Sequence, residues 1–459
     1  MPRHPTRQAG MKTSDTSDRS NSLIEHAHRL LALAEREGAD EAEVFGIHGH
    51  SVDIDLRKDV VELASESFYA GLGLRAAVRG AVGFSCTSDM AALSAVARSA
   101  VKSARARGPD EAWRSLPLPQ KVATPEGIYD ARLEQIGPEE CLDLAARMLA
   151  GLAEVEGVEP VSGGVGCVFG TDFVVNSRGI ELQETSTLMH ASMETIARKT
   201  GSDVATGSEF HNSRSLQPSL EGVGRAAAEM ARASLGGAKA ESGTFHVLLK
   251  PMAVAELLDA TLLSAVCADS VQKGRSALLG RLGEKIASES LRIVDDGLLA
   301  GGLDSSSFDG EGVPSRKNIL IEEGVLKGFL YDSYTAGKDG VISTGNAERS
   351  GYSDVPRVGI RNLIISSPDA RDLLAETRGY LVNGLIGAHT ANPISGDFSV
   401  EARNCFFVAP GVDAKPIRSL MLAGNVFELL KEIDVGTDVR AVGGIVTPTI
   451  RFRMKVVGS

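Results

Sequence analysis

Polar and apolar residues alternate with a period of two in the first half of the chain. Residues 52–56 show this alternation, and it returns over residues 72–78. The pair Arg79-Gly80 then stands where a hairpin turn is expected, so the pattern predicts an antiparallel meander. Residues 161–197 have the same character and predict further strands.

Helical spacing, with apolar residues three or four positions apart, separates these stretches. A helix is predicted to begin at Ser22, where Glu25 completes a capping box, and to end at Gly38. Further helices are expected at 89–107, from Pro138 onward, at 219–235, 251–268, 369–384 and 425–431. Because strands and helices are segregated along the chain, the pattern favours an α+β fold over a doubly wound parallel sheet.

The segments predict two domains. Residues 1–21 are polar and cannot bury enough apolar surface to order themselves, so we expect a disordered tail. The Gly236-Gly237 pair is the clearest boundary. We therefore expect an N-terminal domain over 22–238, with an antiparallel sheet and helices. A C-terminal domain over 239–459 should be mostly strands with a few helices.

Composition and charge exclude several classes of protein. The formal net charge is −12, and no Lys/Arg block follows the first twenty residues, which argues against direct nucleic-acid binding. No apolar run reaches the ~18–20 residues of a membrane span, so we expect a cytoplasmic protein and no membrane contact. The 50 glycines and the 5% aromatic residues indicate close backbone packing and many turns.

No catalytic motif stands on its own. None of the nine histidines is followed by Glu, and the five cysteines form no C-x-x-C pair. His48 and His50 could share one face of a strand and bind a metal, but we favour a solvated turn there. The sequence Gly71–Ala76 fits a loose dinucleotide-binding pattern, yet it lies inside an alternating run and is better explained as a glycine-rich strand.

Two further patterns are weak. Ser270 and Lys273 match S-x-x-K, which occurs in serine–lysine nucleophiles, but the companion motifs K-T-G and S-D-N are missing. The acidic, glycine-rich segment 295–311 has no calcium-loop register, so we expect loop turns closed by Asp side chains.

A longer signature runs through the second half. It comprises GRSALLGRLGEKIASESLRIVDDG (274–297), FDGEGVPSRKNILIEEGVLKGFLYDSYTAGKDG (308–340), STGN (343–346) and ISGDFS (394–399). Taken in this order, with SFYAGLGLRAAVRGAVGFSCTSD (67–89) in the first half, these segments resemble the TldD/PmbA family, the "modulator of DNA gyrase" proteins. The resemblance covers residues 22–459.

The resemblance implies a two-domain α+β fold and a cytoplasmic metallopeptidase that acts on peptides and unfolded chains. In this family the TldD-type subunit carries H-E-x-x-x-H on a helix and a cysteine near the C-terminus as zinc ligands. The TldE-type partner lacks them, and the two form a heterodimer. Here the motif positions fall on Asp259, Ala260 and Ser264, and no cysteine follows Cys405.

We therefore expect a TldE/PmbA-type subunit that is not catalytic by itself and holds no cofactor. Zinc is expected in its TldD-type partner, and the chain would help to form a cavity for a peptide or unfolded polypeptide. The residues expected to line that cavity are Thr344, Gly345, Asn346, Gly396, Asp397, Phe398 and Ser399. Three alternatives stay open: a stand-alone hydrolase that uses Ser270 and Lys273, a gyrase-associated regulator, and half of a complex that modifies a small peptide-like metabolite.

Overall fold

The computed structural model describes residues 13–199 and 203–458, and it confirms the α+β class. The first half is one antiparallel sheet, which we call the N-terminal sheet, with strand order β3-β2-β1-β4-β5-β6. Its strands are β1 (Glu41–Arg57), β2 (Val60–Val78), β3 (Ala81–Thr87), β4 (Val158–Asn176), β5 (Glu181–Arg198) and β6 (Val204–Ser213). In the described residues no helix is both long and apolar enough to cross a membrane.

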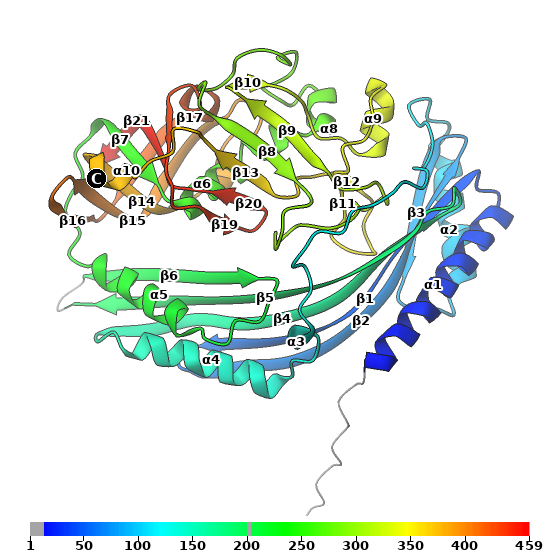
Figure 1. Cartoon of the computed structure of the whole chain (residues 1–459), viewed down its shortest axis with the longest axis horizontal. Coiled ribbons are helices and arrows are strands. Elements are labelled where there is room, and N and C mark those ends of the chain that lie inside the picture. Colours follow the sequence, from blue (N-terminus) through cyan, green and yellow to red (C-terminus); the bar gives the residue numbers. More distant parts are fainter. Residues whose placement is uncertain (1–12, 200–202, 459) are drawn as a thin grey trace, which may run out of the picture.

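Five helices accompany this sheet: α1 (Thr13–Arg36), α2 (Leu93–Arg107), α3 (Ala131–Glu134), α4 (Pro138–Ala153) and α5 (Glu221–Ala233). The longer ones pack as two pairs, α1 with α2 and α4 with α5, over different parts of the sheet (Figure 1). On β1, Val44 packs with α1 and α2, and Val52 packs with α4 and α5. The two residues are an even number of positions apart and so lie on one face of the sheet. The opposite face, with Phe45, packs against Phe308 of the second half.

The second half contains two main sheets. A small sheet has the strand order β10-β9-β8-β13-β20-β19, and a C-terminal sheet follows β14-β7-β21-β17-β15-β16, with β18 on β21. Because β14 also pairs with β15, the C-terminal sheet closes on itself. Its strands are β7 (Gly243–Leu249), β14 (Gly379–Ile386), β15 (Asp397–Ala409), β16 (Val412–Ile417), β17 (Leu420–Asn425), β18 (Ile433–Val435) and β21 (Ile450–Gly458).

The strands of the small sheet are β8 (Arg292–Asp296), β9 (Lys317–Glu322), β10 (Val325–Leu326), β13 (Leu363–Ser366), β19 (Arg440–Val442) and β20 (Ile445–Thr447). A separate two-stranded ladder joins β11 (Ala347–Glu348) and β12 (Arg357–Val358). The helices are α6 (Pro251–Asp259), α7 (Leu262–Ala265), α8 (Ala268–Gln272), α9 (Ser333–Asp339), α10 (Leu373–Glu376), η1 (Ala388–Thr390) and α11 (Val426–Leu429). A single apolar core joins both main sheets and α6.

Most of the predicted elements are confirmed. The hairpin at Arg79-Gly80 is present, with both residues at positive φ, and residues 71–76 lie within β2 as expected of a glycine-rich strand. The first helix begins at Thr13 rather than at Ser22, and the first twelve residues of the predicted tail lie outside the described part. The chain leaves the N-terminal sheet after α5 and enters β7, an interval that includes the expected boundary at 238.

Three predictions are wrong. The turn favoured at His48 and His50 does not exist, because both residues lie inside β1, which is paired on both sides. The helix expected over 369–384 is only α10, and the chain then enters β14. Here pairing with β7 and β15 outweighs helical spacing, and Gly379 permits it, since a Cβ there would lie 2.0 Å from the His246 carbonyl oxygen. The helix expected over 251–268 is broken, as described next.

Candidate functional site

A cavity of about 610 Å³ lies where the resemblance placed the metal-binding motif. Helices α6 and α7 form one wall, and the segments 358–360 and 442–445 form others. We call it the α6–α7 cavity. Its lining residues are Ala255, Glu256, Asp259, Leu263, Ser264, Cys267, Asp304, Glu348, Val358, Gly359, Ile360, Val442, Gly443, Gly444 and Ile445.

The helix that should carry the motif positions is interrupted. Helix α6 ends at Asp259, and α7 begins at Leu262. Between them Thr261 is fully buried, and its hydroxyl donates a 2.6 Å hydrogen bond to the Leu257 carbonyl oxygen. Residues 259 and 264 therefore lie on two different helices, although both side chains reach the same cavity.

Another part of the wall is the C-terminal segment in which the resemblance placed the family's ligand cysteine. Residues 442–445 read Val-Gly-Gly-Ile, so the fold brings the two expected ligand segments together without a histidine or cysteine from either. The cavity's thiol is Cys267, which donates to the Leu263 carbonyl oxygen at 3.1 Å. Burial raises its pKa to about 12, so it stays protonated near neutral pH.

This set of donors does not fit a catalytic zinc. Such a site needs about three convergent His, Cys or carboxylate ligands. Across residues 13–199 and 203–458, no group of three His, Cys, Asp or Glu side chains is placed to hold a metal ion.

The first predicted peptide-binding segment lies behind the cavity wall. Thr344 accepts a 2.7 Å hydrogen bond from the Tyr331 backbone, and Gly345 has a positive φ of 76°. Asn346 is buried, and its side chain donates to Asp295 at 2.7 Å and to the Gly359 carbonyl oxygen at 2.9 Å. The segment thus supports Gly359, which lines the cavity, and does not line it itself.

The second predicted segment lies at the start of β15. Gly396 contacts Phe427, and Phe398 is buried in the core. Asp397 is exposed and accepts hydrogen bonds from Asn425 and Ser395, at 2.8 and 2.7 Å, and Ser399 is exposed as well. None of these residues lines the α6–α7 cavity, and peptide binding by them stays a prediction.

A second cavity of about 210 Å³ lies next to the first, on the side of the N-terminal sheet. Asp304, Glu348 and Ile360 line both cavities, so the two adjoin each other. We call the smaller one the mixed-charge cavity. Its lining residues are Phe45, Asp172, Glu184, Ser186, Arg214, Asp304, Ser305, Ser306, Phe308, Asp309, Gly310, Ala347, Glu348, Arg349, Ile360 and Arg361.

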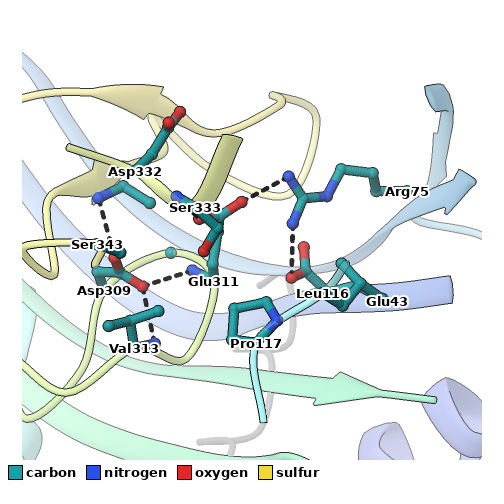
Figure 2. A network of polar contacts seen from close by, with 12 residues as sticks. Glu43, Arg75, Leu116, Pro117, Asp309, Glu311, Val313, Asp332, Ser333 and Ser343 are labelled. Carbon is teal, nitrogen blue, oxygen red and sulfur yellow. Dashed lines mark hydrogen bonds and ion pairs between the residues drawn. The ribbon is translucent and has the colours of Figure 1, made fainter. Parts of the chain in front are cut away.

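A buried network of ion pairs borders this cavity and joins the two halves of the chain (Figure 2). Arg75 of β2 contacts Glu43 of β1 at 2.9 Å and Glu311 of the second half at 2.7 Å. Arg349 forms an ion pair with Glu43 as well. Asp309 accepts backbone hydrogen bonds from Glu311, Val313 and Ala347. Asp309 thus closes loop turns, as expected from the sequence of the acidic segment 295–311.

Sequence reasoning missed the charged residues of the mixed-charge cavity. Asp172 lies on β4, Arg214 follows β6, and Arg361 precedes β13. No motif connects these positions, and only the register of the sheets brings them together. The candidate nucleophile pair is not joined by a side-chain hydrogen bond between Ser270 and Lys273, because the Lys273 ammonium group is paired with Asp269 at 3.0 Å.

Comparison with known proteins identifies the family. Models of the PmbA/TldA metallopeptidase match the chain three times: domain 1 over 42–104, the central domain over 131–235 and the C-terminal domain over 242–458. The chain belongs to the PmbA/TldD family. An uncharacterized protein of Methanocaldococcus jannaschii is 33% identical over 94% of this chain and 99% of its own length.

The solved structures of this PmbA/TldD family extend the comparison. TldE from Thermococcus kodakarensis matches with a TM-score of 0.88 and 28% identity, over 94% of this chain and all of that one. A protein of Thermotoga maritima described as a modulator of DNA gyrase matches with a TM-score of 0.85 and 25% identity, over 95% of this chain and all of that one. The "metalloprotease TldD homolog" of Buchnera aphidicola from Acyrthosiphon pisum is 32% identical over 48% of this chain and 46% of its own length.

Proposed function

We propose that this chain is the non-catalytic, TldE-type subunit of a heterodimeric metallopeptidase. A TldD-type partner carries the zinc, and this chain helps to form the cavity in which a peptide is cleaved or matured. The observation that carries the proposal is the α6–α7 cavity, which residues of 259–264 and 442–445 both line without supplying a histidine or a cysteine. The similarity to TldE over nearly the whole chain supports it further.

The wall of the cavity suggests how a peptide is held. Strand β19 (Arg440–Val442) lies at one edge of the small sheet, and its last residue lines the cavity. An outer strand offers backbone donors and acceptors to an extended chain without selecting its side chains. Gly443 leaves room for such a backbone to come close, because nothing lies within 4 Å of the position that its Cβ would take. We place the complex in the cytoplasm.

The test compares the chain alone with the chain mixed with a TldD-type protein from the same organism. The chain alone should bind no stoichiometric zinc and cleave no unfolded casein. The mixture should elute as one complex in size-exclusion chromatography, with zinc close to one equivalent and with cleavage that a chelator abolishes. Zinc near one equivalent in the chain alone, together with chelator-sensitive cleavage, would contradict the proposal.

The description of the Thermotoga relative favours a second candidate, a regulator that binds DNA gyrase. It predicts that gyrase, and no TldD-type protein, co-purifies with the chain. The net charge of −12 makes contact through protein rather than DNA the form to test.

A further inference from the structure

The mixed-charge cavity holds charges of both signs that do not neutralise one another by contact. Among the charged residues that line it, Arg349 is ion-paired, and Glu184 and Asp309 accept hydrogen bonds. The other five are Asp172, Arg214, Asp304, Glu348 and Arg361. Within residues 13–199 and 203–458, no ion pair within 4.0 Å involves any of the five. Asp172, Asp304 and Glu348 are exposed, and Arg214 and Arg361 are half-buried, so water meets these charges and a ligand of complementary charge can replace that water.

The two arginines keep unused hydrogen-bond donors. Arg214 donates to three carbonyl oxygens, those of Thr187, Gly302 and Leu303. Arg361 donates to the Phe308 carbonyl oxygen at 3.3 Å, and its buried Nε has no hydrogen-bond partner. Since a guanidinium has five N–H donors and no acceptor, both arginines can still bind an anion, and a carboxylate matches their planar geometry.

The three carboxylates are equally available. The side chains of Asp172, Asp304 and Glu348 make no hydrogen bond to any described residue, although all three are reached by solvent from the cavity. Burial and the neighbouring Glu184 raise the pKa of Asp172 to about 6, against the opposing fields of Arg361 and Arg214. Burial also raises the pKa of Asp304. A cation placed among these groups would be stabilised.

We propose that the mixed-charge cavity binds a zwitterion of amino-acid size, with its carboxylate on Arg214 and Arg361 and its ammonium group among Asp172, Asp304 and Glu348. At about 210 Å³ the cavity is smaller than the ~300–1,000 Å³ of ordinary small-molecule pockets, which suits an amino acid or a dipeptide. It shares Asp304, Glu348 and Ile360 with the α6–α7 cavity, so a ligand bound here lies next to the proposed peptide site. The site belongs to this chain alone, so it does not depend on a metallopeptidase partner.

Isothermal titration calorimetry on the purified full-length chain tests the proposal. The probes are glycine, L-alanine, L-glutamate, L-lysine and dialanine, with N-acetylalanine and alaninamide as analogues that each lack one charge. At least one zwitterion should bind with a stoichiometry of one, and both blocked analogues should bind at least tenfold more weakly. Binding by amino acids but not by dialanine identifies a free amino acid as the ligand, and the reverse identifies a peptide.

Two variants locate the site. Asp172→Asn and Arg361→Lys should each weaken binding at least tenfold, whereas Glu159→Gln, which removes an exposed charge on β4 away from the cavity, should not. Because the Asp172 side chain makes no hydrogen bond, Asp172→Asn should fold normally, and circular dichroism checks this. The proposal is overturned if no zwitterion binds up to about 10 mM, a range that covers even millimolar affinities. Equal binding of the blocked analogues, or unchanged binding by Asp172→Asn, overturns it as well.

Discussion

Two groups of charged residues lie side by side between the halves of this molecule, and they are arranged in opposite ways. In the network of Glu43, Arg75 and Glu311, every side chain is at most 6% exposed and contacts an opposite charge. In the neighbouring mixed-charge cavity, Asp172 and Arg361 are reached by solvent and contact no opposite charge. The first arrangement fixes one position of the halves, whereas the second leaves charge available for a ligand.

The difference predicts opposite effects of removing a charge. Breaking a buried pair leaves a charge with neither water nor a partner, which strongly destabilises the fold. Removing an unpaired charge from a cavity wall relieves a cost that the folded state already bears. Perturbed groups of the second kind are therefore better candidates for binding than those of the first.

The largest effect is expected from Arg75→Met. It leaves Glu43 with Arg349 alone and Glu311 with no cation in contact, so the free energy of unfolding should fall by about 3–5 kcal/mol. Urea unfolding followed by the fluorescence of Trp113 measures it, since this is the chain's one tryptophan and its ring lies 5.6 Å from the Arg75 guanidinium carbon.

A matched control is Arg57→Met, which removes an exposed arginine paired with Glu62 and should cost less than about 1 kcal/mol. In the Arg75→Met background, Glu311→Gln should cost less than it does alone, because the carboxylate it removes is already unpaired. Equal costs for Arg75→Met and Arg57→Met would mean that the buried network does not hold the halves together.

Local pattern predicted part of the N-terminal sheet, because apolar residues alternate with others over 52–56 of β1 and 72–78 of β2. Burial along β2 does not alternate: residues 60–70 are mostly exposed, and 71–78 are buried on both faces. The helix break after Asp259 depends on Thr261, whose hydroxyl bonds to the backbone of the previous turn, and helical spacing does not reveal it. Likewise β14 is a strand because β7 and β15 flank it, and these partners lie more than ten residues away in sequence.

The candidate site was predictable only in part. The resemblance identified residues 259–264, and the structure places that segment on a cavity. The mixed-charge cavity could not be predicted, since Asp172, Arg214 and Arg361 come from separate segments that share no spacing. Glycine richness indicated close backbone approach, and the structure gives a clear case at Gly73, which lies against Tyr352 of the second half.

A smaller loss is expected from Gly73→Ala at this contact. A Cβ on Gly73 would lie 2.0 Å from the Tyr352 carbonyl oxygen, so the halves must shift apart locally. Such overpacking typically costs about 1–3 kcal/mol, and urea unfolding measures it. The control is Gly222→Ala in α5, where nothing lies within 4 Å of the added Cβ and helix propensity favours alanine by up to about 1 kcal/mol. A neutral Gly73→Ala would show that the halves tolerate separation there.

The smallest effect on the free energy of unfolding is expected from Asp172→Asn, and at neutral pH its sign is opposite to that of Arg75→Met and Gly73→Ala. The pKa of Asp172 is raised from its ordinary value to about 6, so the folded state holds this proton more tightly than the unfolded chain does. Its contribution is therefore most favourable below about pH 4 and is lost as the pH rises toward 6. The variant should raise the free energy of unfolding at about pH 7.5 and leave it unchanged at about pH 4.

In the wild-type protein several acids contribute to the change of the free energy of unfolding with pH, so the contribution of Asp172 must be separated from theirs. Asp295, Asp309 and Asp332 also have raised pKa values, of about 6, 7 and 6, so they destabilise the fold in the same direction as the pH rises. Asp172→Asn should remove only the contribution of Asp172, so the free energy of unfolding should fall less steeply between about pH 4 and 6. Glu159→Gln should leave this pH dependence unchanged. If Asp172→Asn instead destabilises the protein at neutral pH, Asp172 is a paired charge like Glu43, and the contrast between the network and the cavity fails.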